Sequence, residues 1–279
     1  MREVNVNVIT ERVKQLCIEA NTDLNQEVLD ILDRLGAMEE SPVGKELFAE
    51  YRENAEIARQ EKVALCQDTG LAVIWMDLGQ DVTLVGGDLN EAIDEGVRQG
   101  YKEGYLRKSA CHPFTRKNTG DNTPAILHLN MVPGDKIKLW VVPKGGGAEN
   151  MSIVSMLTPG VGKKGVMDFV VERVRMAGSN PCPPTVVGVG IGGTFEKAAL
   201  LAKKSLLRPL GAPHPDPEVA EMEREILDRV NNLGIGPQGL GGRITSLAVH
   251  IEMIPCHIAS LPVAVNLNCH SHRHKETVI

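Results

Sequence analysis

The chain lacks the features that mark membrane and secreted proteins. It has no apolar run of about 18 residues, so no transmembrane helix is expected. The N-terminus, MREVNVNVITERVKQL, has no apolar segment of the kind found in secretory signal peptides. These two absences predict a cytoplasmic protein that does not act at a membrane.

A basic face is also missing. The net charge is −6, aromatic residues make up only 3% of the chain, and no dense cluster of Lys and Arg with interleaved aromatics occurs. Nucleic-acid binding usually requires such a face, so a nucleic-acid partner is not expected. Small anionic substrates remain possible, because local charge need not follow net charge.

Cysteines two residues apart, as in metal-binding CxxC motifs, are absent as well. No CxxC pair occurs, which disfavours a zinc ribbon or zinc finger. In a cytoplasmic chain, cysteines are better interpreted as thiols, metal ligands or nucleophiles than as a disulfide framework. The six cysteines lie at positions 17, 66, 111, 182, 256 and 269.

The patterns that are present predict an α+β fold, with mixed helices and strands in a single domain over residues 1–279 and a helical N-terminal portion at about 1–62. Ser41-Pro42 resembles an N-cap followed by proline at the first helical position. Further helices are predicted at 89–106, 149–157, 162–177, 195–207 and 218–232. Strands are predicted at 72–76, 126–132, 137–142, 185–191, 244–253 and 261–267, those at 126–132 and 137–142 as a pair joined by Pro133-Gly134-Asp135.

Two segments carry more polar and glycine residues than a connecting loop needs. LCQDTGL (65–71) places an amide, a carboxylate and a hydroxyl between two apolar runs. PKGGGAENMS (143–152) has three consecutive glycines before a helix start, where Glu149 and Asn150 are candidate caps. Backbone N–H groups converging there would suit a carboxylate or phosphate, and a flexible turn is the alternative.

Two further segments contain cysteine or histidine in unusual settings. In SNPCPPTVVGVGIGGTFEKA (179–198) the glycine spacing does not give GxGxxG, so a dinucleotide site is rejected. Cys182 lies there between two prolines, which suits a stiff ligand loop or a buried inert thiol. In MIPCHIASLPVAVNLNCHSHRH (253–274), His272 and His274 are interpreted as a C-terminal tail.

Together, CQDTG, KGGGAENMS, the proline-flanked cysteine before GVGIGGTFEKA, and CHIASLPVAVNLNCH resemble the class I iron–sulfur fumarate hydratases and the related L-tartrate dehydratases. The resemblance covers nearly the whole chain and matches the alpha subunit of two-subunit members. It implies a [4Fe–4S] cluster held by Cys66, Cys182 and Cys269, with one iron open. The other three cysteines fall outside the matched positions and are interpreted as structural.

The same resemblance implies the roles of five other residues. Asp68 and His257 belong to the acid/base machinery, since elimination of water needs one group for the carbon-bound proton and another for the hydroxide. Gln67 and Arg107 match substrate-binding positions, and arginine offers a fork that fits a carboxylate. Gly146 would offer a backbone N–H to the substrate.

The resulting expectation is a hydro-lyase that hydrates fumarate reversibly to L-malate, a reaction of the tricarboxylic acid cycle, with L-tartrate dehydration as the alternative. Two hypotheses of a different class remain. The chain could be a non-catalytic iron–sulfur subunit with a structural or sensing role, or a metal-free protein whose cysteines are incidental. The resemblance also implies a beta-type subunit that completes the site, in an assembly of at least two alpha and two beta chains.

Overall fold

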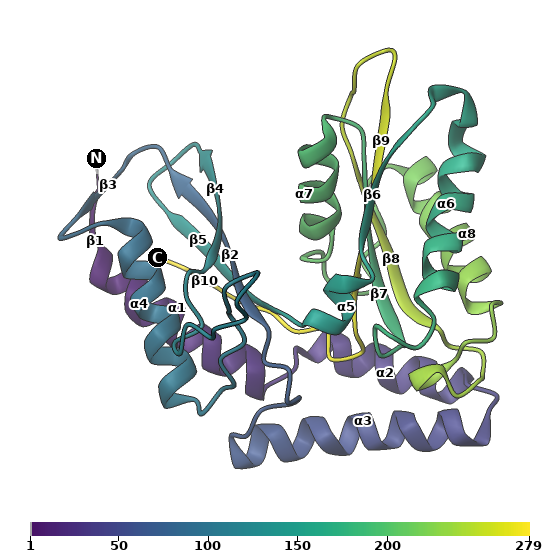
Figure 1. Ribbon diagram of the computed structural model, residues 1–279, viewed down its shortest axis with the longest axis horizontal. Coiled ribbons are helices and arrows are strands. Elements are labelled where there is room, and N and C mark those ends of the chain that lie inside the picture. The colour runs from purple at the N-terminus through teal and green to yellow at the C-terminus, as the bar shows by residue number, and fades with distance from the viewer. Residues whose placement is uncertain (1) are drawn as a thin grey trace. The chain divides into compact units, whose positions relative to one another are not determined.

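The computed structural model describes residues 2–279, which form a mixed arrangement of helices and strands (Figure 1). The α+β class is therefore confirmed. The helices are α1 (Val6–Thr22), α2 (Gln26–Met38), α3 (Pro42–Glu61), α4 (Leu89–Glu103), α5 (Gly146–Asn150), α6 (Gly162–Ala177), α7 (Phe195–Ser205) and α8 (Pro217–Asn231), with 3₁₀ turns at Pro159–Val161 and Pro237–Gly239. The strands are β1 (Arg2–Asn5), β2 (Leu71–Gly79), β3 (Val82–Val85), β4 (Ile126–Val132), β5 (Ile137–Lys144), β6 (Ile153–Leu157), β7 (Thr185–Ile191), β8 (Ser246–Met253), β9 (Leu261–Asn268) and β10 (Lys275–Val278).

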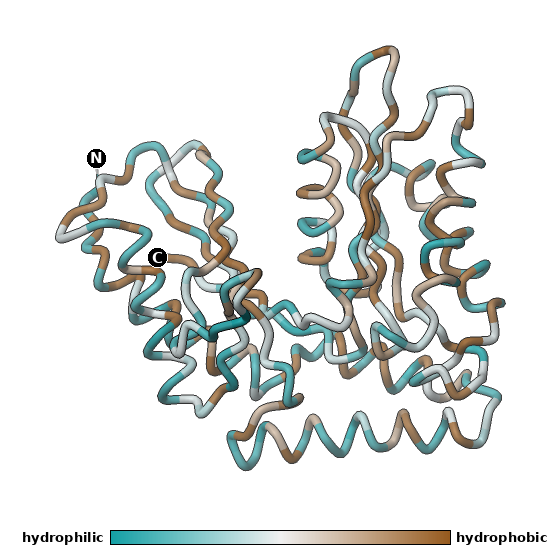
Figure 2. The backbone as a smooth tube through the Cα atoms, viewed as in Figure 1, coloured by the Kyte–Doolittle hydropathy of each residue, from teal (hydrophilic) through white to brown (hydrophobic). Residues whose placement is uncertain are grey.

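The chain folds into two compact units, each built from separate segments. Unit 1 comprises the chain up to Asn25, residues 54–146 and residues 273–279, and unit 2 comprises residues 26–53 and 147–272. Hydrophobic residues concentrate along the strands in both units (Figure 2). No helix within residues 2–279 is long and apolar enough to cross a membrane.

Unit 1 has a four-stranded sheet in the order β10-β5-β2-β4, and β1 pairs with β3 in a separate parallel ribbon. Strand β2 runs parallel to β4 and antiparallel to β5. Helices α1 and α4 pack against each other, and α1 also contacts β5. Their apolar faces share one core with the sheet, including Ile9, Val13, Ile74 and Leu139, each fully or almost fully buried.

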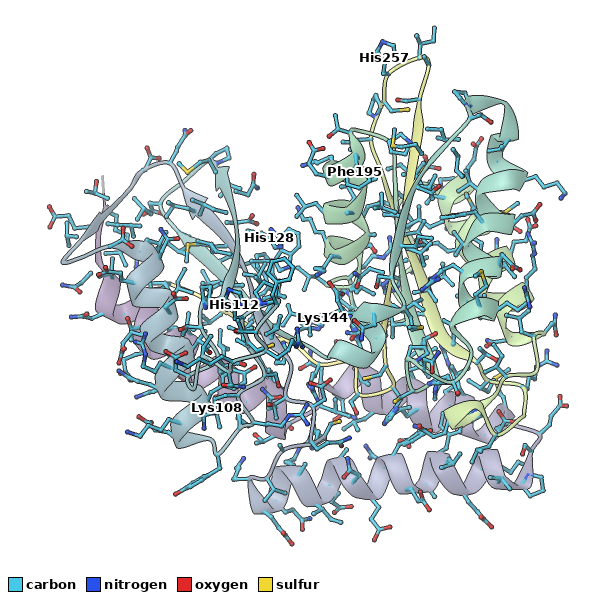
Figure 3. The ribbon with its side chains drawn as sticks, in the orientation of Figure 1. Lys108, His112, His128, Lys144, Phe195 and His257 are labelled. Atoms are coloured by element: carbon cyan, nitrogen blue, oxygen red, sulfur yellow. The ribbon has the colours of Figure 1, made fainter. Side chains whose placement is uncertain are left out.

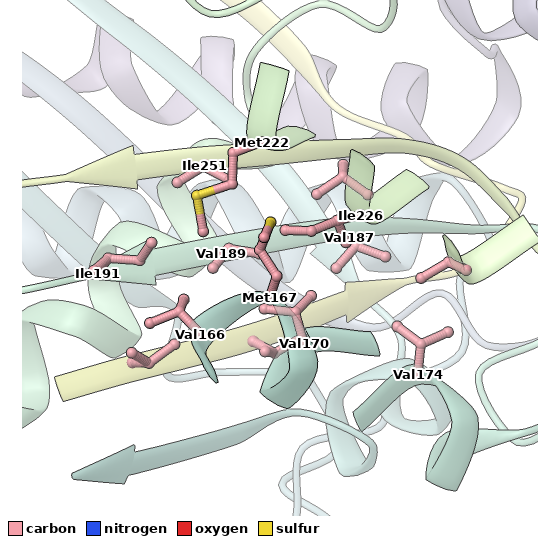
Figure 4. Packing of buried hydrophobic residues seen from close by; sticks show 14 of the residues in the cluster. Val166, Met167, Val170, Val174, Val187, Val189, Ile191, Met222, Ile226 and Ile251 are labelled. Carbon is pink, nitrogen blue, oxygen red and sulfur yellow. The ribbon is translucent and has the colours of Figure 1, made fainter. Parts of the chain in front are cut away.

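Unit 2 has a four-stranded sheet in the order β6-β9-β7-β8, with α7 on one face and α6 and α8 on the other (Figure 1). On strand β7, Val187, Val189 and Ile191 alternate toward the core formed with α6 and α8 (Figure 4). Gly188 and Gly190 point to the opposite face, where an added Cβ would lie 2.2 and 2.0 Å from backbone oxygens of α7. Gly188 and Gly190 therefore allow helix α7 to pack closely on the strand.

The helical N-terminal portion forms as predicted, including the cap at Ser41, whose hydroxyl accepts a hydrogen bond from Gly44 N–H at 3.3 Å. The predicted helix at 149–157 is wrong. Helix α5 ends at Asn150, and 153–157 is strand β6, which pairs antiparallel with β9. Pairing of its apolar, partly β-branched sequence with a buried strand outweighs the short helical pattern.

Two further expectations are corrected. Strands β4 and β5 form, but they do not pair with each other, because β2 lies between them and the connection through Pro133-Gly134-Asp135 crosses the end of β2. The C-terminal histidines are not a tail. His272 and His274 are 1% and 6% exposed and lead into strand β10, whose pairing with β5 orders this end of the chain.

Candidate active site

The CQDTG segment forms a tight turn between helix α3 and strand β2 of unit 1. The Asp68 carboxylate accepts hydrogen bonds from Gly70 N–H at 3.1 Å and from Gly146 N–H at 2.7 Å. The guanidinium of Arg107 lies 3.5 Å from the same carboxylate. Two residues predicted from distant motifs, Gly146 and Arg107, therefore lie at the carboxylate of a third, Asp68.

Cys66 and Gln67 lie at the start of the same turn. The Cys66 sulfur accepts a hydrogen bond from Asp68 N–H at 3.4 Å, and Gln67 Oε1 lies 3.4 Å from that sulfur. The Cys66 residue is partly exposed. The turn thus presents a thiol, an amide and a carboxylate from consecutive residues.

Buried side chains that the sequence did not single out hold this turn. Tyr101 is fully buried near the C-terminal end of helix α4, and its hydroxyl donates to the carbonyl of Thr69 at 2.7 Å and lies 3.1 Å from that of Gly70. Burial raises the pKa of the Tyr101 phenol, so the hydroxyl remains protonated and available as a donor. The Thr69 hydroxyl in turn donates to the carbonyl of Arg107 at 2.7 Å. The turn and the Arg107 segment are therefore joined directly.

Asn122 makes the second link between them. Its side chain is fully buried, and its Oδ1 accepts hydrogen bonds from the N–H groups of Ser109 at 2.6 Å and Ala110 at 3.0 Å. Its Nδ2 donates to the carbonyl of Gly70 at 3.1 Å. Residues 111–124 looked like an ordinary loop, and no local pattern marks one buried asparagine within it.

A buried cation also contacts the turn. Arg273 is 3% exposed, and its Nη2 donates to the carbonyl of Asp68. Its Nε and Nη1 atoms have no hydrogen-bond partner among residues 2–279. A buried guanidinium is costly unless it is compensated, so its position beside the Cys66–Gly70 turn favours an anionic environment there.

Two of the predicted cysteines lie at one end of the unit 2 sheet. Cys182 precedes strand β7 and Cys269 follows strand β9, and these antiparallel strands align Val186 with Asn268. The N–H of His270 donates to the carbonyl of Cys182 at 3.3 Å, which ties the two loops together.

Tyr51 on helix α3 reinforces this end of unit 2. Its ring stacks on His270 with centroids 4.2 Å apart, and its hydroxyl donates to the carbonyl of Pro183 at 3.4 Å. Burial raises the pKa of Tyr51, and Cys182 and Cys269 lie close enough to add to that shift. The two cysteines therefore share one small region of the unit.

The glycine-rich start of α5 contacts a carboxylate, but this carboxylate is a side chain of the same protein chain. The N–H of Gly146 binds the Asp68 carboxylate. The Glu149 carboxylate accepts hydrogen bonds from Lys203 at 2.5 Å and from Asn266 at 3.0 Å. In unit 2, a Cβ added to Gly147 would lie 3.3 Å from the carbonyl of Asn180, so the turn lies next to the loop that carries Cys182.

His257 lies at the tip of the exposed loop between strands β8 and β9 (Figure 3). Its Nδ1 accepts a hydrogen bond from Ala259 N–H at 3.1 Å, and its carbonyl accepts one from Ser260 N–H at 2.9 Å. The loop precedes strand β9, whereas Cys269 follows it, so His257 and the cysteine pair lie at opposite ends of the unit 2 sheet. The structure therefore does not bring His257 together with Cys182 and Cys269 within one copy.

None of the cysteines within residues 2–279 forms a disulfide. Cys17 is fully buried, and burial raises the pKa of its thiol to about 12, as suits a structural residue. Cys66 belongs to unit 1, and Cys182 and Cys269 belong to unit 2. In the described part of the chain, no three side chains of His, Cys, Asp or Glu form a group that could hold a metal ion.

Comparison with known proteins agrees with the motifs. The family model described as fumarate hydratase (Fumerase) matches residues 10–278. A protein of Methanocaldococcus jannaschii named putative L(+)-tartrate dehydratase subunit alpha is 41% identical over 271 residues, which cover 95% of each chain. The L(+)-tartrate dehydratase subunit alpha of Escherichia coli (strain K12) is 35% identical over 272 residues, covering 96% of this chain and 89% of the relative.

Proposed function

Because the chain belongs to the fumarate hydratase family, a family of hydro-lyases, we propose that it is the alpha subunit of a [4Fe–4S]-dependent enzyme that hydrates fumarate reversibly to L-malate. The observation that carries this proposal is the arrangement around Asp68. Its carboxylate is held by Gly146 N–H at 2.7 Å, lies 3.5 Å from Arg107, and follows Cys66 by two residues. The proposed cluster ligand Cys66, the proposed acid/base residue Asp68 and the proposed carboxylate-binding residue Arg107 thus lie in one small region.

The residues proposed to hold the cluster are Cys66, Cys182 and Cys269. Their chemistry fits, because each thiol is at least partly exposed and none is consumed in a disulfide. The Cys66 sulfur already accepts an amide N–H, as a thiolate ligand does. When bound, such a cluster supplies a Lewis-acidic iron toward the substrate's oxygen atoms.

The side chains of this chain account for the remaining needs of the reaction. The Arg107 side chain is 56% exposed and so is free to turn from Asp68 to a substrate carboxylate, which it would bind through its fork. Gln67 follows Cys66 directly and offers an amide for a substrate oxygen. Asp68 and His257 are proposed to handle the proton on carbon and the proton on the departing hydroxyl.

The N–H of Gly146 would then serve two different acceptors in turn. It holds Asp68 in the arrangement described here, and in the complex with substrate it is proposed to donate to the second carboxylate. Both acceptors are carboxylate oxygens, so one backbone donor serves either without a change in chemistry. The buried guanidinium of Arg273 adds positive charge to the same region.

Dehydration of L-tartrate is the second candidate, and the names of the relatives favour it. Tartrate and malate differ by one hydroxyl group, and the residues around Asp68 suit both. A non-catalytic iron–sulfur subunit would need the cysteines but not a carboxylate positioned beside an exposed arginine. The arrangement around Asp68 therefore supports catalysis over a sensing or structural role.

A partner subunit is part of the proposal. A dicarboxylate carries two negative charges, and further cationic groups beyond Arg107 are expected to hold it firmly. The names of the relatives specify an alpha subunit, which supports a beta-type partner that supplies such groups. We propose a cytoplasmic assembly of two alpha and two beta chains, in which residues 1–279 act as one catalytic domain.

The test is anaerobic reconstitution of the chain with its partner, followed by assays with fumarate, L-malate and both enantiomers of tartrate. Interconversion of fumarate and L-malate with only weak turnover of tartrate supports the primary proposal. Efficient dehydration of L-tartrate with little fumarate hydration transfers the assignment to the alternative. A complex that contains iron and sulfide but turns over none of these compounds contradicts the catalytic role.

A further inference from the structure

Strand β8 leaves part of its backbone unpaired at the edge of the unit 2 sheet. In the order β6-β9-β7-β8 it pairs with β7 on one side, and within residues 2–279 no strand lies on the other. Alternate residues of a strand turn their N–H and carbonyl groups to opposite sides. The N–H of Ile251 faces the free side, because it donates to the Glu223 carboxylate at 2.7 Å. Val249, two residues earlier on the same strand, therefore also turns its N–H and carbonyl to the free edge.

A cavity of about 300 Å³ lies at this edge. Helices α2 and α8, strand β8 and the loop at residues 211–213 border it, and Val249 is one of the residues that line it. Much of the lining is apolar and includes Ile31, Ala212, Pro213, Leu227 and Leu247. The volume is at the lower end of the range found for small-molecule sites. The cavity therefore suits a small ligand with an apolar body that reaches the open edge of β8.

The charged residues that line the cavity favour an anion. Arg34 on α2 and Arg224 on α8 have exposed side chains, and Glu223 is the one acidic residue in the lining. The charge of Glu223 is compensated by its ion pair with Arg208. Arg224 pairs with Glu221, but both side chains are more than half exposed, and such surface pairs contribute little. The lining thus presents an excess of positive charge.

The hydrogen-bonding groups of the cavity specify the ligand further. Ile251 shows that an N–H on this edge binds a carboxylate, and the N–H of Val249 offers the same contact. Two acceptors accompany this donor. One is the Val249 carbonyl, and the other belongs to His250, which lines the cavity and is 2% exposed. Because Nδ1 of His250 lies 3.2 Å from the Ser205 carbonyl, Nε2 is the ring atom left to accept from a ligand.

We propose that this cavity, the β8 edge site, binds a small 2-hydroxy acid with an apolar side chain. The carboxylate of the ligand accepts hydrogen bonds from the Val249 N–H and from Arg34. Its hydroxyl group donates to the Val249 carbonyl or to His250 Nε2, and its side chain occupies the apolar part of the cavity. No residue of the proposed catalytic machinery lines the site, so the proposal does not depend on the proposed function.

Two other occupants fit these groups less well. A peptide strand would need several consecutive open positions, but Glu223 already occupies the edge at Ile251. An amino acid would carry an ammonium group in place of the hydroxyl group, which the positive charges of Arg34 and Arg224 disfavour. A hydroxy acid provides a donor at the same place without that charge.

Calorimetric titration of the full chain with L-2-hydroxy-4-methylpentanoate tests the proposal. We expect saturable binding with a Kd of about 1 mM or lower, and amide NMR should show the largest shift at Val249. Arg34→Gln should weaken binding at least about tenfold, because it removes a charge-assisted hydrogen bond. Ala212→Trp, which fills the cavity from the loop, should abolish binding. Arg175→Gln alters an exposed arginine of α6 outside the cavity and should leave the Kd unchanged.

Altered ligands test the assigned chemistry. 4-Methylpentanoate lacks the hydroxyl group and 2-hydroxy-4-methylpentanamide lacks the negative charge, so each should bind at least about tenfold more weakly. Equal affinity of the parent acid for the wild type, Arg34→Gln and Ala212→Trp would overturn the proposal. So would a loss of binding in Arg107→Gln with full binding in Arg34→Gln, since the acid would then occupy the site around Asp68. Tighter binding of leucine than of the hydroxy acid would contradict the assigned ligand class.

Discussion

His250 makes the stability of unit 2 sensitive to mild acid. It lies on strand β8, is 2% exposed, and its Nδ1 lies 3.2 Å from the carbonyl of Ser205, to which it donates in the neutral form. Burial lowers its pKa to about 4, and the nearby positive charge of Arg208 acts in the same direction. The folded chain therefore keeps this imidazole neutral at pH values where the unfolded chain protonates it.

The sign and size of the effect follow from linkage. Between the folded pKa of about 4 and the ordinary value of 6.5, the unfolded state binds the additional proton, so stability falls as the pH is lowered. The loss begins near the unfolded pKa and is complete near the folded pKa. From pH 7 to pH 5 this one group should remove about 2 kcal/mol from the free energy of unfolding, and about 3 kcal/mol below pH 4.

Urea unfolding at pH 7 and pH 5, at constant ionic strength, measures this loss. His250→Gln keeps a polar side chain but cannot titrate, so its loss between the two pH values should be smaller than that of the wild type by about 2 kcal/mol. Equal losses in the wild type and His250→Gln would refute the reasoning.

Four other predictions concern the proposed site. Cys182→Ser should greatly lower bound iron and sulfide, whereas Cys256→Ser, at an unmatched cysteine, should not; metal analysis decides. Asp68→Asn should retain iron but lower turnover by roughly a hundredfold in steady-state assays. Asn122→Ala removes three buried hydrogen bonds and should cost about 3 kcal/mol of stability and speed hydrogen exchange at residues 66–70. Air should abolish activity, and ferrous iron with a thiol reductant should restore it.

The helices were the most predictable part of the fold. Their apolar periodicity is local, and Ser41-Pro42 marked the start of α3 correctly. The short strands β1, β3, β6 and β10 escaped prediction, because each is stabilised by pairing with a residue range distant in sequence. The burial of His274 has the same origin, since it directly precedes strand β10, which pairs with β5 in unit 1. His272 is buried within unit 2, where its Nδ1 lies 2.9 Å from the side-chain nitrogen of Asn268.

The site was predictable where a motif carries its chemistry in consecutive residues. CQDTG indicated a carboxylate, and the glycines at 145–147 indicated backbone N–H groups that could bind a carboxylate. The N–H of Gly146 does donate a hydrogen bond to the Asp68 carboxylate. The supports of the turn were not predictable. Tyr101, Asn122 and Arg273 act through backbone carbonyls brought near by folding, and nothing in their local sequence distinguishes them from core or loop residues.

Hydration of fumarate by the reconstituted complex tests the central claim most directly. The full chain with its cluster rebuilt, the partner alone and the two together are incubated anaerobically with fumarate in deuterated water, and L-malate is followed by NMR. The account predicts stereospecific deuterated malate only when both chains are present, and none when Cys182→Ser replaces the wild type. Equal malate formation by the Cys182→Ser complex, or by the partner alone, would contradict it.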